Sequence, residues 1–98
     1  MYNYIDIKRI GELNLSNNSI LLDIRDKYEY ILGNIPGSIN IPYLYILTIP
    51  QNYLKFDTIY YIYCDNGVKS KKICNYLNEL GYKTVDLVGG YKEYLDGR

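Results

Sequence analysis

A chain of 98 residues has the length of one compact domain, and its 11 Lys and Arg residues balance its 11 Asp and Glu residues. This balance gives no electrostatic reason to expect nucleic acid as a partner, and no apolar run has the length of a membrane span. The absence of histidine excludes a Cys-His or Ser-His nucleophilic pair, and two cysteines alone cannot form a zinc site. We therefore expect a single cytoplasmic domain over residues 1–98, without a metal and without a cofactor.

The first half of the chain is predicted to alternate between short strands and short helices. In chain order these are a strand at 2–7, helical turns at 8–13, a strand at 19–24, a helix at 26–32, a brief strand at 39–41, and a helix that begins at Pro42 and is broken by Pro50. The run at 19–24 is nearly all apolar, as expected for a strand covered on both faces. Asp26 and Glu29 have the spacing of a capping box, and Gly33 is a typical helix terminator.

The second half contains the strongest predictions. Residues 58–63 are β-branched and aromatic, which indicates a strand, and residues 67–80 have the apolar spacing of an amphipathic helix with Leu80 on its buried stripe. A strand at 84–88 and a helix to about residue 95 complete the chain. Strands that alternate with helices favour a parallel sheet with helices on both faces. The predicted fold class is therefore α/β, in three α/β/α layers around a mainly parallel five-stranded sheet.

The segment after the strongest strand is the most informative one. The strand ends at Cys64, and a short loop that contains Gly67 leads into the next helix. Backbone N–H groups at a helix N-terminus favour an anion, so this arrangement favours a thiolate over a thiol. Ligands of such folds lie beyond the carboxyl ends of the strands, which is where Cys64 is expected. Cys74 lies within the predicted helix and is expected to be structural.

The chain resembles the rhodanese family of sulfurtransferases over most of its length. The segments that carry this resemblance occur in the family's order and are residues 22–25 (LDIR), 33–42 (GNIPGSINIP), 63–70 (YCDNGVKS), 80–82 (LGY) and 87–90 (LVGG). Each segment alone is a weak motif, whereas all of them in sequence are specific.

The resemblance implies that Cys64 is a catalytic nucleophile that carries a persulfide between a sulfur donor and an acceptor. The substrate-binding loop would consist of Asp65, Asn66, Gly67, Val68, Lys69 and Ser70, with Asp23 and Arg25 in support. For Asp23 and Arg25, a structural ion pair or turn hydrogen bond is the favoured reading. The expected partners are a small-molecule donor, either thiosulfate or a persulfide, and a thiol, cyanide or protein acceptor. Neither nucleic acid nor a membrane is expected as a partner.

Lys69 departs from the family pattern, which usually has Arg at this position of the loop. Lys keeps the positive charge but loses the planar fork of donors that suits an oxyanion. Asp65 adds a negative charge to the same loop. Both features are expected to weaken the binding of thiosulfate. They favour an alternative function, in which the chain is a sulfur carrier or interaction module with little thiosulfate turnover.

Two further functions are less well supported by the sequence. Cysteine phosphatases of related fold need an Arg six positions beyond the cysteine, where this chain has Ser70 in a loop that is one residue too short. A dithiol redox protein would need a Cys-x-x-Cys pair, which is absent.

Overall fold

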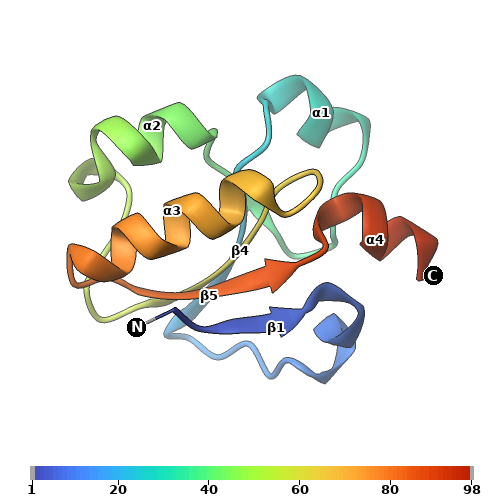
Figure 1. Cartoon of the computed structure of the whole chain (residues 1–98), viewed down its shortest axis with the longest axis horizontal. Helices are drawn as coiled ribbons and strands as arrows, with labels where there is room; N and C mark the ends of the chain where they lie inside the picture. Colours follow the sequence, from blue (N-terminus) through green and yellow to red (C-terminus); the bar gives the residue numbers. More distant parts are fainter. Residues whose placement is uncertain (1, 98) are drawn as a thin grey trace.

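The computed structural model of the chain describes residues 2–97 and shows a five-stranded sheet with helices on both faces (Figure 1). The elements are β1 (Tyr4–Asp6), the 3-10 helix η1 (Ile7–Glu12), β2 (Ser19–Asp23), α1 (Lys27–Leu32), β3 (Ile39–Asn40), α2 (Tyr43–Thr48), the 3-10 helix η2 (Pro50–Asn52), β4 (Ile59–Tyr63), α3 (Val68–Glu79), β5 (Lys83–Val88) and α4 (Gly90–Asp96). The strand order is β1-β5-β4-β2-β3, and every neighbouring pair is parallel. This architecture confirms the predicted α/β fold class.

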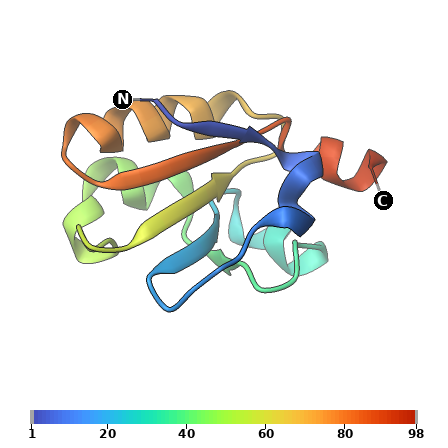
Figure 2. The same cartoon turned by 90° about the horizontal axis from the view of Figure 1, so that it is seen from below.

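The alternation of side chains along β4 divides the core into two clusters, one on each face of the sheet. Tyr60 and Ile62 belong to the cluster that α2 and α3 cover, whereas Tyr63 belongs to the cluster that η1 and α4 cover. Successive residues of an extended chain point to opposite faces, so Cys64 returns to the side of α3. Figure 2 shows the strands side by side in their sheet order, with β4 in the middle of the sheet.

Two helix details differ from the sequence predictions. Helix α3 ends at Glu79, and Leu80 is its C-cap. Leu80 is 45% exposed, so it does not extend the buried stripe. The stripe instead consists of Ser70, Ile73, Cys74 and Leu77, which are all buried. Asp26 is the N-cap of α1, but its side chain makes no capping hydrogen bond, so the predicted capping box is wrong.

The carboxyl ends of the parallel strands share one edge of the sheet. The loop between β4 and α3 emerges at this edge, between α1 and α4 (Figure 1). None of the helices within residues 2–97 has the length and apolar character needed to cross a membrane.

Candidate active site

Cys64 lies directly after β4, and its side chain is covered by the loop that follows it. The residue is only 3% exposed, and its Sγ accepts hydrogen bonds from the backbone N–H groups of Gly67, at 3.1 Å, and Ser70, at 3.3 Å. Gly67 has a φ of +90°, in the left-handed region that favours glycine, and this turns the chain into α3. Two amide donors at a helix N-terminus stabilise negative charge on Sγ.

Side chains of the loop hold its backbone in this conformation. The Asn66 side-chain oxygen Oδ1 accepts a hydrogen bond from the Val68 N–H at 3.1 Å. The Ser70 hydroxyl donates to the carbonyl oxygen of Gly67 at 3.3 Å. Ser70 therefore contacts the sulfur through its backbone amide, while its hydroxyl stabilises the turn.

The N-terminus of α4 fixes the loop from the opposite side. The Tyr91 N–H donates to the carbonyl oxygen of Cys64 at 2.8 Å, and the Lys92 N–H donates to that of Asp65 at 3.0 Å. Gly90 allows this approach, because a Cβ there would lie 2.5 Å from the carbonyl oxygen of Asp65. The sequence suggests a tight turn or close packing at Gly90, but it does not reveal that Gly90 packs against the cysteine loop.

A cavity of about 350 Å³ lies over the thiol at the carboxyl edge of the sheet. It is lined by Ile24, Arg25, Asp26, Glu29, Cys64, Asp65, Asn66, Val68 and Lys69. The predicted loop residues thus divide into two groups, since Gly67 and Ser70 contact the sulfur while the others line the cavity. Asp26 and Glu29 of the α1 segment were not predicted here, because their spacing already had an explanation as a helix cap.

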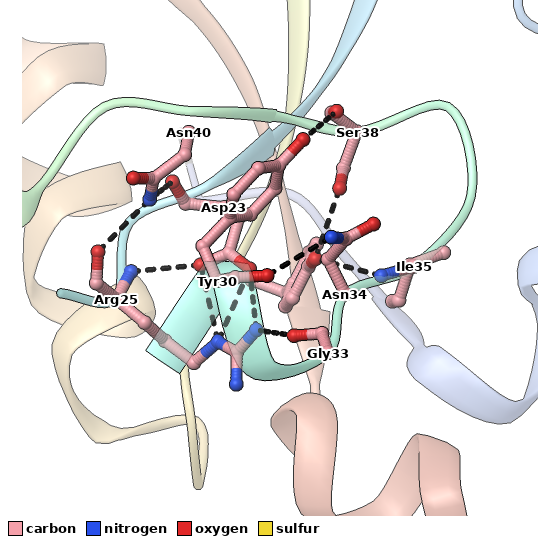
Figure 3. A network of polar contacts seen from close by, with 9 residues as sticks. Asp23, Arg25, Tyr30, Gly33, Asn34, Ile35, Ser38 and Asn40 are labelled. Carbon is pink, nitrogen blue, oxygen red and sulfur yellow. Dashed lines mark hydrogen bonds and ion pairs between the residues drawn. The ribbon is translucent and has the colours of Figure 1, made fainter. Parts of the chain in front are cut away.

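Asp23 and Arg25 form a buried ion pair (Figure 3), and Arg25 also lines the cavity. The guanidinium donates to both carboxylate oxygens of Asp23, the shortest contact being 2.8 Å, and also to the carbonyl oxygen of Gly33 at 2.6 Å. It lies over the Tyr91 ring, with Cζ 4.1 Å from the ring centroid. This guanidinium is therefore held by the protein itself, and Asp23 offsets its charge.

The phenol of Tyr63 extends the same buried network. Its hydroxyl oxygen accepts a hydrogen bond from the Ile35 N–H at 3.1 Å and contacts the Ser38 hydroxyl at 3.1 Å. Burial raises the pKa of Tyr63, so the phenol remains neutral at physiological pH. The network anchors the 33–38 turn behind β4, and Tyr63 has a structural role.

Lys69 lines the cavity, but its ammonium group lies close to an aromatic ring. Its Nζ is 5.5 Å from the centroid of the Tyr43 ring, within the range of a cation–π interaction. Tyr43, the first residue of α2, therefore contacts the cationic group of Lys69, which the sequence places in the cysteine loop.

The second cysteine belongs to the same core cluster as Cys64 but does not line the cavity. Cys74 is fully buried in α3, and burial raises the pKa of its thiol from 9.0 to about 12. Both cysteines are free thiols. A neutral thiol packed in the core is a poor nucleophile. Both cysteines are buried, but only Cys64 is among the residues that line the cavity.

Comparison with known proteins identifies the family of this chain. Residues 8–96 match the family described as the rhodanese-like domain. The chain belongs to the rhodanese family. This membership confirms the resemblance inferred from the sequence, and it supports sulfur transfer as the general activity.

Solved rhodanese structures share the fold of this chain. A rhodanese-like domain protein from Staphylococcus aureus is 32% identical, with a TM-score of 0.75 over 90% of this chain and 86% of the other. A human single-domain sulfurtransferase has a TM-score of 0.80 over 100% of this chain and 99% of the other. Its 22% identity shows a common fold only.

The curated relatives of this chain are longer proteins that are named as hydroxylases and not as sulfurtransferases. A tRNA uridine(34) hydroxylase from Streptococcus suis is 34% identical over 93% of this chain, and one from Buchnera aphidicola is 28% identical over 94%. The chain spans 30% and 31% of these two proteins, respectively. The rhodanese family thus includes modules of larger enzymes as well as separate domains.

Proposed function

We propose that the chain is a sulfurtransferase in which Cys64 carries sulfur as a persulfide. The observation that carries this proposal is the environment of Cys64, which lines the cavity and whose Sγ accepts hydrogen bonds from two backbone N–H groups at the start of α3. These donors favour the thiolate without a histidine, which the chain lacks. The hydroxylase name of the curated relatives belongs to proteins about three times as long, so it gives less support than this site does.

The reaction is a double displacement. The Cys64 thiolate attacks the outer sulfur of a donor such as thiosulfate or a persulfide, a new S–S bond forms, and the donor leaves with the electron pair of the broken bond. A thiol or cyanide acceptor then attacks the terminal sulfur and releases the thiolate. The amides of Asp65, Asn66 and Lys69 would hold the terminal sulfur, since none of them donates to an acceptor within residues 2–97. No general base is needed.

Mass spectrometry of the intact protein tests the intermediate. After treatment with excess thiosulfate or inorganic polysulfide, we expect one added sulfur atom on Cys64. The variant Cys64→Ser should gain none, and Cys74→Ala should behave as the unmodified chain because Cys74 is buried in the core. The proposal is wrong if no donor adds sulfur, or if the sulfur maps to Cys74.

A sulfur-carrier function is the second candidate. It is favoured by the position of Lys69 over Tyr43 and by the carboxylate of Asp65, because both reduce the attraction for thiosulfate at the cavity. Turnover of thiosulfate with cyanide as acceptor distinguishes the two functions. Rapid steady-state turnover supports an enzyme that uses thiosulfate, whereas persulfide formation with little turnover supports the carrier.

A further inference from the structure

Helix α1 presents an unusual apolar surface next to the Cys64 cavity. No residue of this helix is buried, and Tyr28, Ile31 and Leu32 are 72%, 67% and 71% exposed, respectively. The i, i+3 and i+4 spacing places these three side chains on one side of the helix, and we call them the α1 stripe. A contiguous apolar surface beside a site is typical of a region that binds another molecule.

A second hollow lies between Leu32 of the α1 stripe and the Cys64 cavity. This hollow has a volume of about 360 Å³ and is lined by Arg25, Glu29, Leu32, Gly33, Asp65, Tyr91 and Leu95. Arg25, Glu29 and Asp65 also line the Cys64 cavity, so the two hollows adjoin. The side chains of Leu32 and Leu95 are 71% and 40% exposed, and they supply an apolar wall. The resulting groove extends well beyond the space that a small donor needs.

Carboxylates dominate the charge along this groove. Asp26, Glu29 and Asp65 line the Cys64 cavity, and Asp23 already offsets the charge of Arg25. Lys69 is the remaining cation of the lining, and its ammonium group lies over an aromatic ring. The groove therefore has an excess of negative charge, which repels a dianion and attracts a cationic partner.

We propose that the Cys64 persulfide passes its sulfur to a cysteine of a polypeptide that has Lys or Arg beside that cysteine and places an apolar side chain against Leu32 and Leu95. This inference rests on the proposed function and specifies the acceptor. The cations would face Asp26 and Glu29, and the apolar side chain would cover exposed leucine surface that a small thiol leaves in water. The carboxylates and the exposed leucine surface thus favour the same kind of partner.

The transfer is balanced without an oxidant or a reductant. The acceptor thiolate attacks the outer sulfur of the Cys64 persulfide, and an S–S bond forms on the acceptor cysteine. The bond between Sγ and the outer sulfur breaks, and its electron pair returns to Sγ. This restores the thiolate beneath the amides of Gly67 and Ser70.

The test uses the chain loaded with one sulfur atom and two cysteine peptides of equal length. One peptide has Lys on both sides of its cysteine and a nearby Leu, and the other has Glu in place of each Lys. The rate at which Cys64 loses its added sulfur is followed by intact mass at low salt. Each rate is divided by the rate at which the same peptide attacks a small-molecule disulfide. We expect the Lys peptide to be about tenfold faster, with the difference shrinking as salt is added.

Protein variants test separately the acidic part and the apolar part of the groove. The double variant Asp26→Asn, Glu29→Gln should reduce the ratio of Lys-peptide to Glu-peptide rates about threefold or more, and the exposed control Glu79→Gln should keep it. Leu32→Ser should slow the Leu peptide relative to a matching Ala peptide. The control Leu44→Ser, also at an exposed leucine but outside both hollows, should not.

Three results would overturn the proposal while leaving the persulfide chemistry intact. These are equal corrected rates for the two peptides, a rate ratio that the double variant does not change, or a Leu32→Ser variant that alters the oligomeric state without altering peptide rates. The last result would show that the α1 stripe binds a second copy of the chain. Failure to load Cys64 with sulfur would instead overturn the proposed function and this inference together.

Discussion

Replacement of Gly90 by alanine tests how strongly the cysteine loop depends on α4. An added Cβ would lie 2.5 Å from the carbonyl oxygen of Asp65 and 2.8 Å from that of Cys64, and both atoms belong to backbone that cannot rotate away. The φ of +70° at Gly90 is a second source of strain, which costs about 1–2 kcal/mol for a residue with a Cβ. Relief of the overlap requires α4 and the loop to separate, which weakens the hydrogen bonds from the amides of Tyr91 and Lys92.

Those two hydrogen bonds contribute about 1 kcal/mol each, so the total loss in the free energy of unfolding should be about 2–5 kcal/mol. A displacement of the loop by a fraction of an ångström should also slow persulfide formation about 10- to 100-fold in the folded protein. Urea unfolding gives the first quantity, and the rate of sulfur addition to Cys64 by intact mass gives the second.

Gly37 provides a matched control for the substitution. It has a φ of +87°, but nothing lies within 4 Å of a Cβ at this position. Gly37→Ala should therefore show only the backbone strain of about 1–2 kcal/mol and a normal rate of persulfide formation. Equal unfolding free energies for Gly37→Ala and Gly90→Ala, together with equal persulfide rates, would show that contact with α4 does not position the loop.

Two further predictions concern buried ionisable groups. Asp23→Asn leaves the guanidinium of Arg25 buried without a carboxylate, so the free energy of unfolding measured in urea should fall by about 3–5 kcal/mol. The control Glu12→Gln breaks the exposed ion pair with Arg9 and should lower it by at most about 1 kcal/mol. Similar losses for the two variants would contradict the argument from burial. Because burial raises the pKa of Cys74 from 9.0 to about 12, the unfolded chain loses this proton first as the pH rises above 9, and stability falls. Between pH 9 and pH 10, the free energy of unfolding of Cys74→Ala should therefore fall by about 1 kcal/mol less than that of the unmodified chain. Parallel plots of unfolding free energy against pH for the two proteins would refute the raised pKa of Cys74.

The sequence predicts the fold and the position of the thiol because both depend on local patterns. An apolar run at β4 that ends in Cys64, followed by Gly67 and an amphipathic helix, defines a strand, a turn and a helix N-terminus within a short stretch. The structure adds the hydrogen bonds from the amides of Gly67 and Ser70 to the sulfur. A pattern of residue types cannot supply these bonds, since they depend on the backbone angles of the loop.

The rim of the cavity could not be predicted in the same way. Asp26 and Glu29 have a spacing that suggests a helix cap, and only the packing of α1 beside the loop turns them toward the cavity. The position of the Lys69 ammonium group depends on Tyr43, which lies in a different helix. The α4 contact likewise joins Gly90 to a loop that precedes it by a whole helix and strand. Each of these features requires the tertiary structure.

The inner and outer parts of the site place different electrostatic demands on a ligand. The sulfur of Cys64 accepts hydrogen bonds of 3.1 and 3.3 Å from amides that the fold holds in place, and such short contacts are little affected by salt. The carboxylates of Asp26, Glu29 and Asp65 act through solvent at the edge of the cavity, where their effect is weaker and screened. The nucleophile proposed for sulfur transfer would therefore lie beneath a rim that repels anionic donors. The charge of the rim can change the choice of partner while the sulfur keeps its amide donors.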